Sequence, residues 1–83
     1  MLNIKVLGSG CANCSRLESE TRAALDDAGI AYDLIKVTDY DAISAYGVLS
    51  TPALVINEKV VSAGRIPARA RIVELARAGE AAG

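Results

Sequence analysis

Two cysteines, Cys11 and Cys14, stand where a strand-like segment of this chain gives way to a helix-like one. An apolar run at residues 2–7 and a Gly-Ser-Gly segment precede them, and helical periodicity follows. We therefore expect both sulfurs in the first turn of a helix that follows a strand. A helix N-terminus presents unpaired N–H groups and a positive partial charge, which favour a thiolate over a thiol. The spacing thus predicts a reactive cysteine pair at a strand-to-helix junction.

Periodicity along the rest of the chain predicts an α/β fold. Apolar residues recur at helical spacing until Gly29, which suits a helix C-cap, and alternation then indicates a strand. A strand, a helix and a strand within about 35 residues form a right-handed unit with parallel strands. The predicted order is β-α-β-α-β-β-α, a mixed sheet flanked by helices, with strands at 2–7, 30–37, 53–56 and 59–63 and helices at 11–28, 40–46 and 67–79.

Length and charge limit the domain organisation and the partners. The 83 residues predict one small domain over 1–79 and a frayed tail over 80–83. The net charge is −1 and the basic residues are dispersed, which argues against nucleic acid or an anionic membrane surface as the main partner. We also expect a monomer. The absence of histidine removes the usual proton shuttle, the Cys-His nucleophile pair and the commonest metal ligand.

The N-terminal segment and the cysteine usage predict a cytoplasmic protein. The apolar stretch at the N-terminus spans about six residues and contains Lys5, whereas a signal peptide needs a longer apolar core. No window approaches the roughly 20 apolar residues of a membrane-spanning helix. In the cytosol a disulfide is more often transient and catalytic than structural, and a bridge across two intervening residues closes too short a loop to add much stability.

The cysteine pair is compatible with redox chemistry, with metal binding and with plain burial. In the redox interpretation Cys11, nearest the helix end, is the nucleophile, and Cys14, one turn in and facing the core, is the resolving thiol. In the metal interpretation the two thiolates clamp a soft ion such as Cu(I), because a structural Zn(II) site wants four ligands. Two small buried hydrophobic side chains are the third interpretation. We favour redox exchange without a cofactor or a resident metal, and keep a Cu(I) carrier as the alternative.

Thr51-Pro52 bears on this choice, because it opens a strand expected near the centre of the sheet, where proline is poorly tolerated. A cis Thr51–Pro52 bond explains the proline, and a trans proline at the start of the strand explains it equally well. A bend there exposes the backbone N–H and C=O of Thr51 as a short edge. An extended substrate peptide can pair with that edge beside Cys11, so the redox interpretation includes Thr51 and Pro52 in a substrate site.

The whole pattern resembles the thioredoxin fold, and more narrowly the small redox-active disulfide proteins, a glutaredoxin-sized group. The heavy-metal-associated domains resemble only the loop around the cysteines, and Ser9 stands where their loop has methionine. The segments that carry the thioredoxin resemblance are Gly8-Ser9-Gly10-Cys11-Ala12-Asn13-Cys14, Tyr46-Gly47-Val48, Thr51-Pro52-Ala53-Leu54-Val55-Ile56 and Ala63-Gly64.

This resemblance implies a thiol–disulfide oxidoreductase or an electron relay. It implies a four-stranded sheet in the order 2-1-3-4 and a cis Pro52 beside the cysteines. The implied partners are a disulfide-containing protein or small molecule and an upstream reductase. The implied site residues are Cys11 and Cys14 as attacking and resolving thiols, Thr51, Pro52 and Gly64 at the substrate, and Gly10, Ala12 and Asn13 in support.

Four arginines, Arg65, Arg69, Arg71 and Arg77, lie in the last third of the chain. They could form a docking face for an acidic partner, or favour the thiolate if they lie near Cys11. An ordinary solvated helix face explains them more simply, because charged side chains are mostly exposed. We therefore expect a solvated face.

Overall fold

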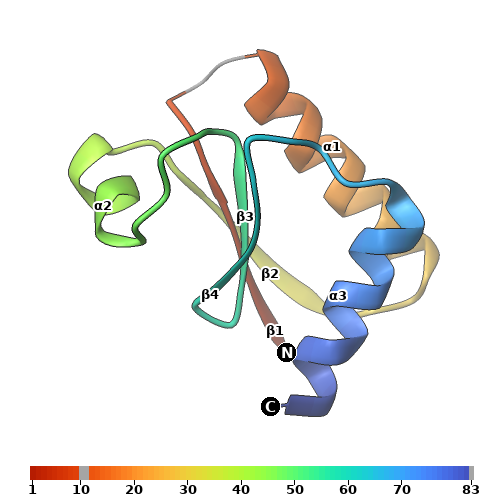
Figure 1. The fold of residues 1–83 in the computed structure, drawn as a ribbon. Coiled ribbons are helices and arrows are strands. Elements are labelled where there is room, and N and C mark those ends of the chain that lie inside the picture. Colours follow the sequence, from red (N-terminus) through yellow and green to blue (C-terminus); the bar gives the residue numbers. More distant parts are fainter. Residues whose placement is uncertain (10–11, 83) are drawn as a thin grey trace.

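The computed structural model describes residues 1–9 and 12–82, and in this range the predicted order of elements is confirmed (Figure 1). Three strands have the predicted bounds, while β2 and the helices differ at their ends. No helix in the described part of the chain is long and apolar enough to cross a membrane. The elements are β1 (Leu2–Leu7), α1 (Ala12–Asp27), β2 (Tyr32–Val37), α2 (Tyr40–Ala45), β3 (Ala53–Ile56), β4 (Lys59–Ala63) and α3 (Arg69–Ala82).

Local interactions explain where the element ends differ from the predicted ones. β2 begins at Tyr32 rather than two residues earlier, because the Ile30 N–H turns back to the Leu25 carbonyl at 3.0 Å and closes the C-terminus of α1. α3 continues to Ala82, into the segment expected to be a frayed tail. Alanine and glutamate, which make up this extension, are strong helix formers.

The sheet has the strand order β2-β1-β3-β4 that the resemblance implied (Figure 1). β1 pairs with β2 in parallel, whereas β3 runs antiparallel to both β1 and β4. The crossover through α1 makes the parallel pair, and a short turn makes the antiparallel pair β3–β4. β1 and β3 are therefore the central strands, paired on both sides, and β2 and β4 are the edges.

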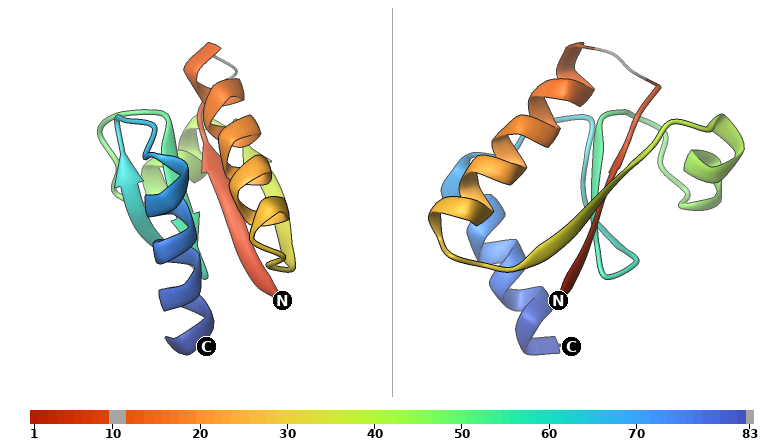
Figure 2. Two further views of the ribbon diagram at one scale, coloured as in Figure 1. Left: turned by 90° about the vertical axis from the view of Figure 1, so that its right-hand side faces the viewer. Right: turned by 180° about the vertical axis from the view of Figure 1, so that it is seen from behind.

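The helices divide between the two sides of the sheet (Figures 1 and 2). α1 and α3 lie side by side on one face, and α2 lies on the other side. An aliphatic core that includes Ile4 and Val6 packs with residues of α1 and α3, and a smaller core around Leu7, Ile43 and Val55 lies beneath α2. Alternation along β1 explains the split, because successive side chains point to opposite faces of the sheet.

One end of the molecule collects the segments that the sequence assigned to the site (Figures 1 and 2). The start of α1 lies at this end, together with the loop that leads into β3 and the loop from β4 to α3. The two chain termini lie at the opposite end. Residues far apart in the sequence thus meet at the N-terminus of α1.

The turn between β3 and β4, at the end that carries the termini, is held by Asn57. Asn57 and Glu58 both have positive φ, 51° and 68°, as a two-residue hairpin turn of the primed kind requires. The Asn57 side chain accepts a hydrogen bond from the Asn3 N–H at 3.0 Å and donates one to the Gly79 carbonyl at 3.2 Å. One amide group therefore joins the hairpin to both β1 and α3.

Candidate active site

Cys14 lies in the first turn of α1 and faces the core. Helical spacing aligns it with the buried residues further along α1, so its exposed fraction is 5%, whereas Ala12 and Asn13 are exposed. Cys14 is disulfide-bonded in this structure. Cys11 and Gly10, the other predicted residues of this segment, lie outside the described residues.

Gly8, which directly follows β1, packs against Cys14. It is buried, and its N–H donates to the Val37 carbonyl at 2.9 Å, which extends the β1–β2 pairing. A Cβ atom at this position would lie closer than 3.0 Å to Cys14 Sγ and 3.1 Å from Cys14 Cβ, with Thr51 Cβ at 3.9 Å. The missing side chain thus lets β1, α1 and the loop before β3 meet. Sequence reasoning left Gly8 without a role, although a glycine at a buried strand end signals such a close approach.

Thr51 and Pro52 lie next to this contact, and the peptide bond between them is cis, as the resemblance implied. Pro52 is buried and directly precedes β3, whose first residue pairs with Leu7 of β1. The register of the central strands therefore brings the Thr51–Pro52 turn alongside Gly8. The Pro52 carbonyl accepts a hydrogen bond from the Gly64 N–H at 2.9 Å. The structure thus brings together the three residues predicted to contact substrate.

Gly64 directly follows β4 and has a backbone conformation that favours glycine. Its φ is 75°, in the left-handed region that side chains disfavour. A Cβ atom there would lie 2.9 Å from Ser50 Cβ, in the loop that leads to the cis peptide bond. Any side chain at Gly64 would therefore displace that loop.

A groove of about 400 Å3 runs along this region. It is bordered by the start of α1, by the Thr51–Pro52 turn and by the segment between β4 and α3. Thr51 also lines a second cavity of about 380 Å3, where Tyr40 and Leu49 are exposed by 79% and 102%. We name the first cavity the Pro52 groove; its lining residues are Asn13, Arg16, Glu20, Thr51, Pro52 and residues 64–68.

The charges of the Pro52 groove are unevenly paired. The Glu20 carboxylate accepts hydrogen bonds from Nε and Nη2 of Arg69, at 3.3 and 2.8 Å. These hydrogen bonds lower the pKa of Glu20, and the charge of Arg16 lowers it further. Arg16 and Arg65 line the groove and make no ion pair with any residue that the structure describes. Because Arg69 neutralises Glu20, the groove has an excess of positive charge.

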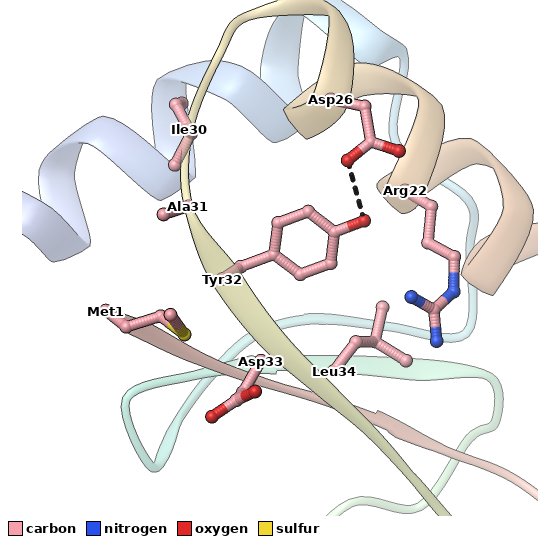
Figure 3. Close-up of a pocket in the computed structure, with 8 residues that line it drawn as sticks. All are labelled: Met1, Arg22, Asp26, Ile30, Ala31, Tyr32, Asp33 and Leu34. Carbon is pink, nitrogen blue, oxygen red and sulfur yellow. Dashed lines mark hydrogen bonds between the residues drawn. The ribbon is translucent and has the colours of Figure 1, made fainter.

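Another cavity, of about 470 Å3, lies between α1 and the edge strand β2 (Figure 3). Its wall includes Met1, at the end of the molecule that carries the termini (Figure 1). Tyr32 donates a hydrogen bond to Asp26 Oδ1 at 3.0 Å, and burial together with this bond raises the pKa of Tyr32. No cysteine lines this cavity, so we place it outside the candidate site. In the described ranges, 1–9 and 12–82, no group of three or more His, Cys, Asp or Glu side chains is placed to hold a metal ion.

Known proteins share this sequence pattern over nearly the whole chain, and a thioredoxin domain family model matches residues 2–77. The chain is 31% identical over 75 residues to a thioredoxin of Methanothermobacter thermautotrophicus, which covers 90% of this chain and 97% of that protein. It is 31% identical over 74 residues to a thioredoxin of Methanocaldococcus jannaschii, which covers 89% of this chain and 85% of that protein. Glutaredoxin 1 from Francisella tularensis, solved in complex with cacodylate, aligns over the full length of both chains with a TM-score of 0.45 and 14% identity. The chain belongs to the thioredoxin domain family.

Proposed function

We propose that this protein is a thiol–disulfide oxidoreductase that cycles Cys11 and Cys14 between a dithiol and a disulfide. The observation that carries the proposal is the meeting of Cys14, Gly8 and the Thr51–Pro52 turn at the start of α1. Membership of the thioredoxin domain family supports this general type of activity. The two thioredoxins that resemble this chain support it in the same way.

The proposed reduction proceeds in two thiol–disulfide exchanges. The Cys11 thiolate attacks one sulfur of the client disulfide, which breaks the client S–S bond, forms a mixed disulfide and releases one client thiolate. The Cys14 thiolate then attacks the Cys11 sulfur, forms the Cys11–Cys14 disulfide and releases the second client thiolate. Two electrons pass to the client, and its two thiolates take up protons. A dithiol reductase, as the upstream partner, restores the Cys11–Cys14 dithiol by the reverse exchange.

The burial of Cys14 supports this assignment of roles. A side chain with an exposed fraction of 5% has little access to a client disulfide. It can nevertheless attack the sulfur of a cysteine three positions earlier in the sequence, as the proposed second exchange requires. Cys11 is therefore proposed as the nucleophile, and Gly10, Ala12 and Asn13 as the residues that support the pair.

The Pro52 groove is proposed to hold the client segment beside Cys11. Thr51 is exposed, and its backbone can pair with an extended peptide in the manner of an added strand. The Pro52 carbonyl already accepts a hydrogen bond from the Gly64 N–H, so the backbone of Thr51 is the one proposed to pair with the client peptide. Glycine at position 64 allows the Ser50 loop, which leads into Thr51 and Pro52, to keep its place beside β4. A reducing compartment such as the cytoplasm suits this use, because the couple must be returned to the dithiol after each turnover.

Single-turnover reactions of cysteine variants test the proposal. The reduced protein is mixed with a peptide disulfide, and released thiol and protein adducts are counted by mass spectrometry. The wild type should release two equivalents of peptide thiol and keep no adduct. Cys14→Ser should release one equivalent and accumulate a mixed disulfide, and Cys11→Ser should react far more slowly. An adduct on Cys11→Ser but not on Cys14→Ser would reverse the roles, and no exchange by the wild type would refute the proposal.

A further inference from the structure

Two arginines from different elements, Arg16 and Arg65, line the Pro52 groove. Arg16 projects from α1, one turn after Asn13, and Arg65 follows Gly64 in the segment between β4 and α3. Neither makes an ion pair with a residue in the described part of the chain. Two cations that line one groove without an ion pair raise its positive potential, so an anionic ligand is favoured there.

Arg69 and Arg71 differ from Arg16 and Arg65, because each is paired with a glutamate. Arg69 makes its two hydrogen bonds to Glu20, and Arg71 Nη1 pairs with Glu74 at 3.4 Å. Two of the four arginines expected on a solvated helix face, Arg69 and Arg71, thus have acidic partners from the chain itself. Arg65 and Arg77 make no ion pair in the described ranges, and of these two only Arg65 lines the Pro52 groove. Because Arg65 lines the Pro52 groove, it does not belong to the solvated helix face expected from the sequence.

We infer that the Pro52 groove selects client disulfides whose cysteine lies in an acidic peptide segment. Arg16 and Arg65 are the residues that would bind the acidic side chains of this segment. This inference rests on the proposed function, since the groove is the one assigned to the client. A guanidinium group matches a carboxylate by two parallel hydrogen bonds, which a lysine side chain does not offer. The chain as a whole has a net charge of −1, so the positive charge is local to the groove rather than a general property.

The second cavity beside Thr51 favours a peptide over a small disulfide. Thr51 lines both cavities, and the second one exposes the apolar side chains of Tyr40 and Leu49. An extended chain that pairs with Thr51 would continue from the Pro52 groove into this second cavity, where it would meet the exposed side chains of Tyr40 and Leu49. The expected client segment is therefore acidic on one side of its reacting cysteine and apolar on the other. A small disulfide would occupy only one of the two cavities.

The inference is tested with peptide disulfides that differ only in charge. Three peptides carry two glutamates, two glutamines or two lysines beside the cysteine, and the second-order rate constant of reduction is measured for each. At low salt the glutamate peptide should react about three- to tenfold faster than the glutamine peptide, and the lysine peptide more slowly than either. In Arg16→Gln/Arg65→Gln the glutamate-to-glutamine ratio should fall to about one. Arg77→Gln, which removes an arginine late in α3, should keep the wild-type ratio.

Two further measurements separate failure of the inference from failure of the proposed function. Thioether analogues of the same peptides cannot be reduced, so their affinities report binding alone. If the wild type reduces all three peptides at equal rates, or if the double variant keeps the preference, the inference is overturned while the redox function stands. If the glutamate thioether binds more tightly in an arginine-dependent way but no peptide is reduced, the groove assignment stands and the redox function fails. An arginine-dependent rate with oxidised glutathione, without any charge preference among the peptides, would also overturn the inference.

Discussion

Replacement of Gly8 by alanine tests how tightly the residue after β1 packs against Cys14, through its effect on the free energy of unfolding. The new Cβ atom would lie closer than 3.0 Å to Cys14 Sγ, whereas carbon–carbon contacts are optimal at about 3.5–4.0 Å. The nearest atoms are the Sγ and Cβ atoms of the buried Cys14, which have little freedom to move because the side chain is enclosed. Among the described glycines, those with positive φ are Gly29, Gly47 and Gly64, so the cost at Gly8 is steric rather than conformational.

The expected magnitude follows from overpacking of a buried site. Forced methyl groups in well-packed interiors cost about 1–3 kcal/mol, and the rigidity of this site places Gly8→Ala near 3 kcal/mol. Small domains unfold with about 5–15 kcal/mol, so the variant should lose a large share of its stability. With an m-value of about 1 kcal/mol per molar urea, the unfolding midpoint should fall by about 2–3 M.

A double-mutant cycle in reducing buffer assigns the loss to the Cys14 sulfur. In Cys14→Ala the sulfur is gone, and the alanine Cβ would meet the new Gly8→Ala methyl group at 3.1 Å, which small shifts can relieve. The double variant should therefore be more stable than the sum of the single losses predicts, by about 2 kcal/mol. Gly47→Ala is the matched control: its Cβ meets no atom within 4 Å, so its loss should not couple to Cys14. Additive losses at Gly8 and Cys14, or an unchanged midpoint for Gly8→Ala, would refute the packing argument.

Two further changes have measurable consequences. Asn57→Ala removes the hydrogen bonds to Asn3 and Gly79 and places a less tolerant residue at positive φ, so urea unfolding should show a loss of about 1–3 kcal/mol. Arg69→Gln should flatten the acid side of the stability profile, because hydrogen bonding from Arg69 lowers the pKa of Glu20 in the folded state. A carboxyl with a lowered folded pKa adds stability above its ordinary pKa of about 4.5, and that stability is lost as the pH falls through the folded value. Urea midpoints between about pH 6 and pH 3 should therefore fall more steeply for the wild type than for the variant.

Neighbouring substitutions serve as controls for these two changes. Lys59→Ala, at an exposed position just after the turn, should change stability by less than about 0.5 kcal/mol, and an equal loss there would contradict the role of Asn57. Arg77→Gln should leave the acid side of the profile unchanged. Equal flattening by Arg77→Gln would show that the effect is one of net charge rather than of the Arg69–Glu20 pair.

The order and type of the elements could be predicted because each carries a local signal. The apolar run of β1, the periodicity of α1 and the glycine that closes α1 are each recognised from residues that are close together in the chain. The strand order came from the resemblance, because pairing between β1 and β3 joins residues about fifty positions apart and leaves no periodic trace. Helix ends depended on caps, such as the Ile30 N–H that closes α1, and these were predicted only to within a few residues.

The parts of the candidate site that are marked by residue type and spacing could be predicted from the sequence. The parts that depend on contacts between distant segments of the chain could not. Cysteine spacing and Thr51-Pro52 indicated the site directly. Arg16 and Glu20 were not singled out, because an arginine and a glutamate on the polar face of a helix have no distinguishing pattern in sequence. Only folding brings Arg69 to Glu20, 49 residues away, and leaves Arg65 on the groove. The contact between Gly8 and Cys14 likewise depends on the packing of α1 over β1.

Thiol counting across graded redox buffers, on protein stripped of metal, tests the central claim most directly. The account predicts that Cys11 and Cys14 lose their thiols together, at one midpoint potential, and regain them when a dithiol is added. Both thiols should disappear without any change in mass beyond the loss of two hydrogens. Thiols that stay reduced in oxidising buffer, while the chain binds one Cu(I) per molecule, would contradict a redox couple and favour a metal carrier.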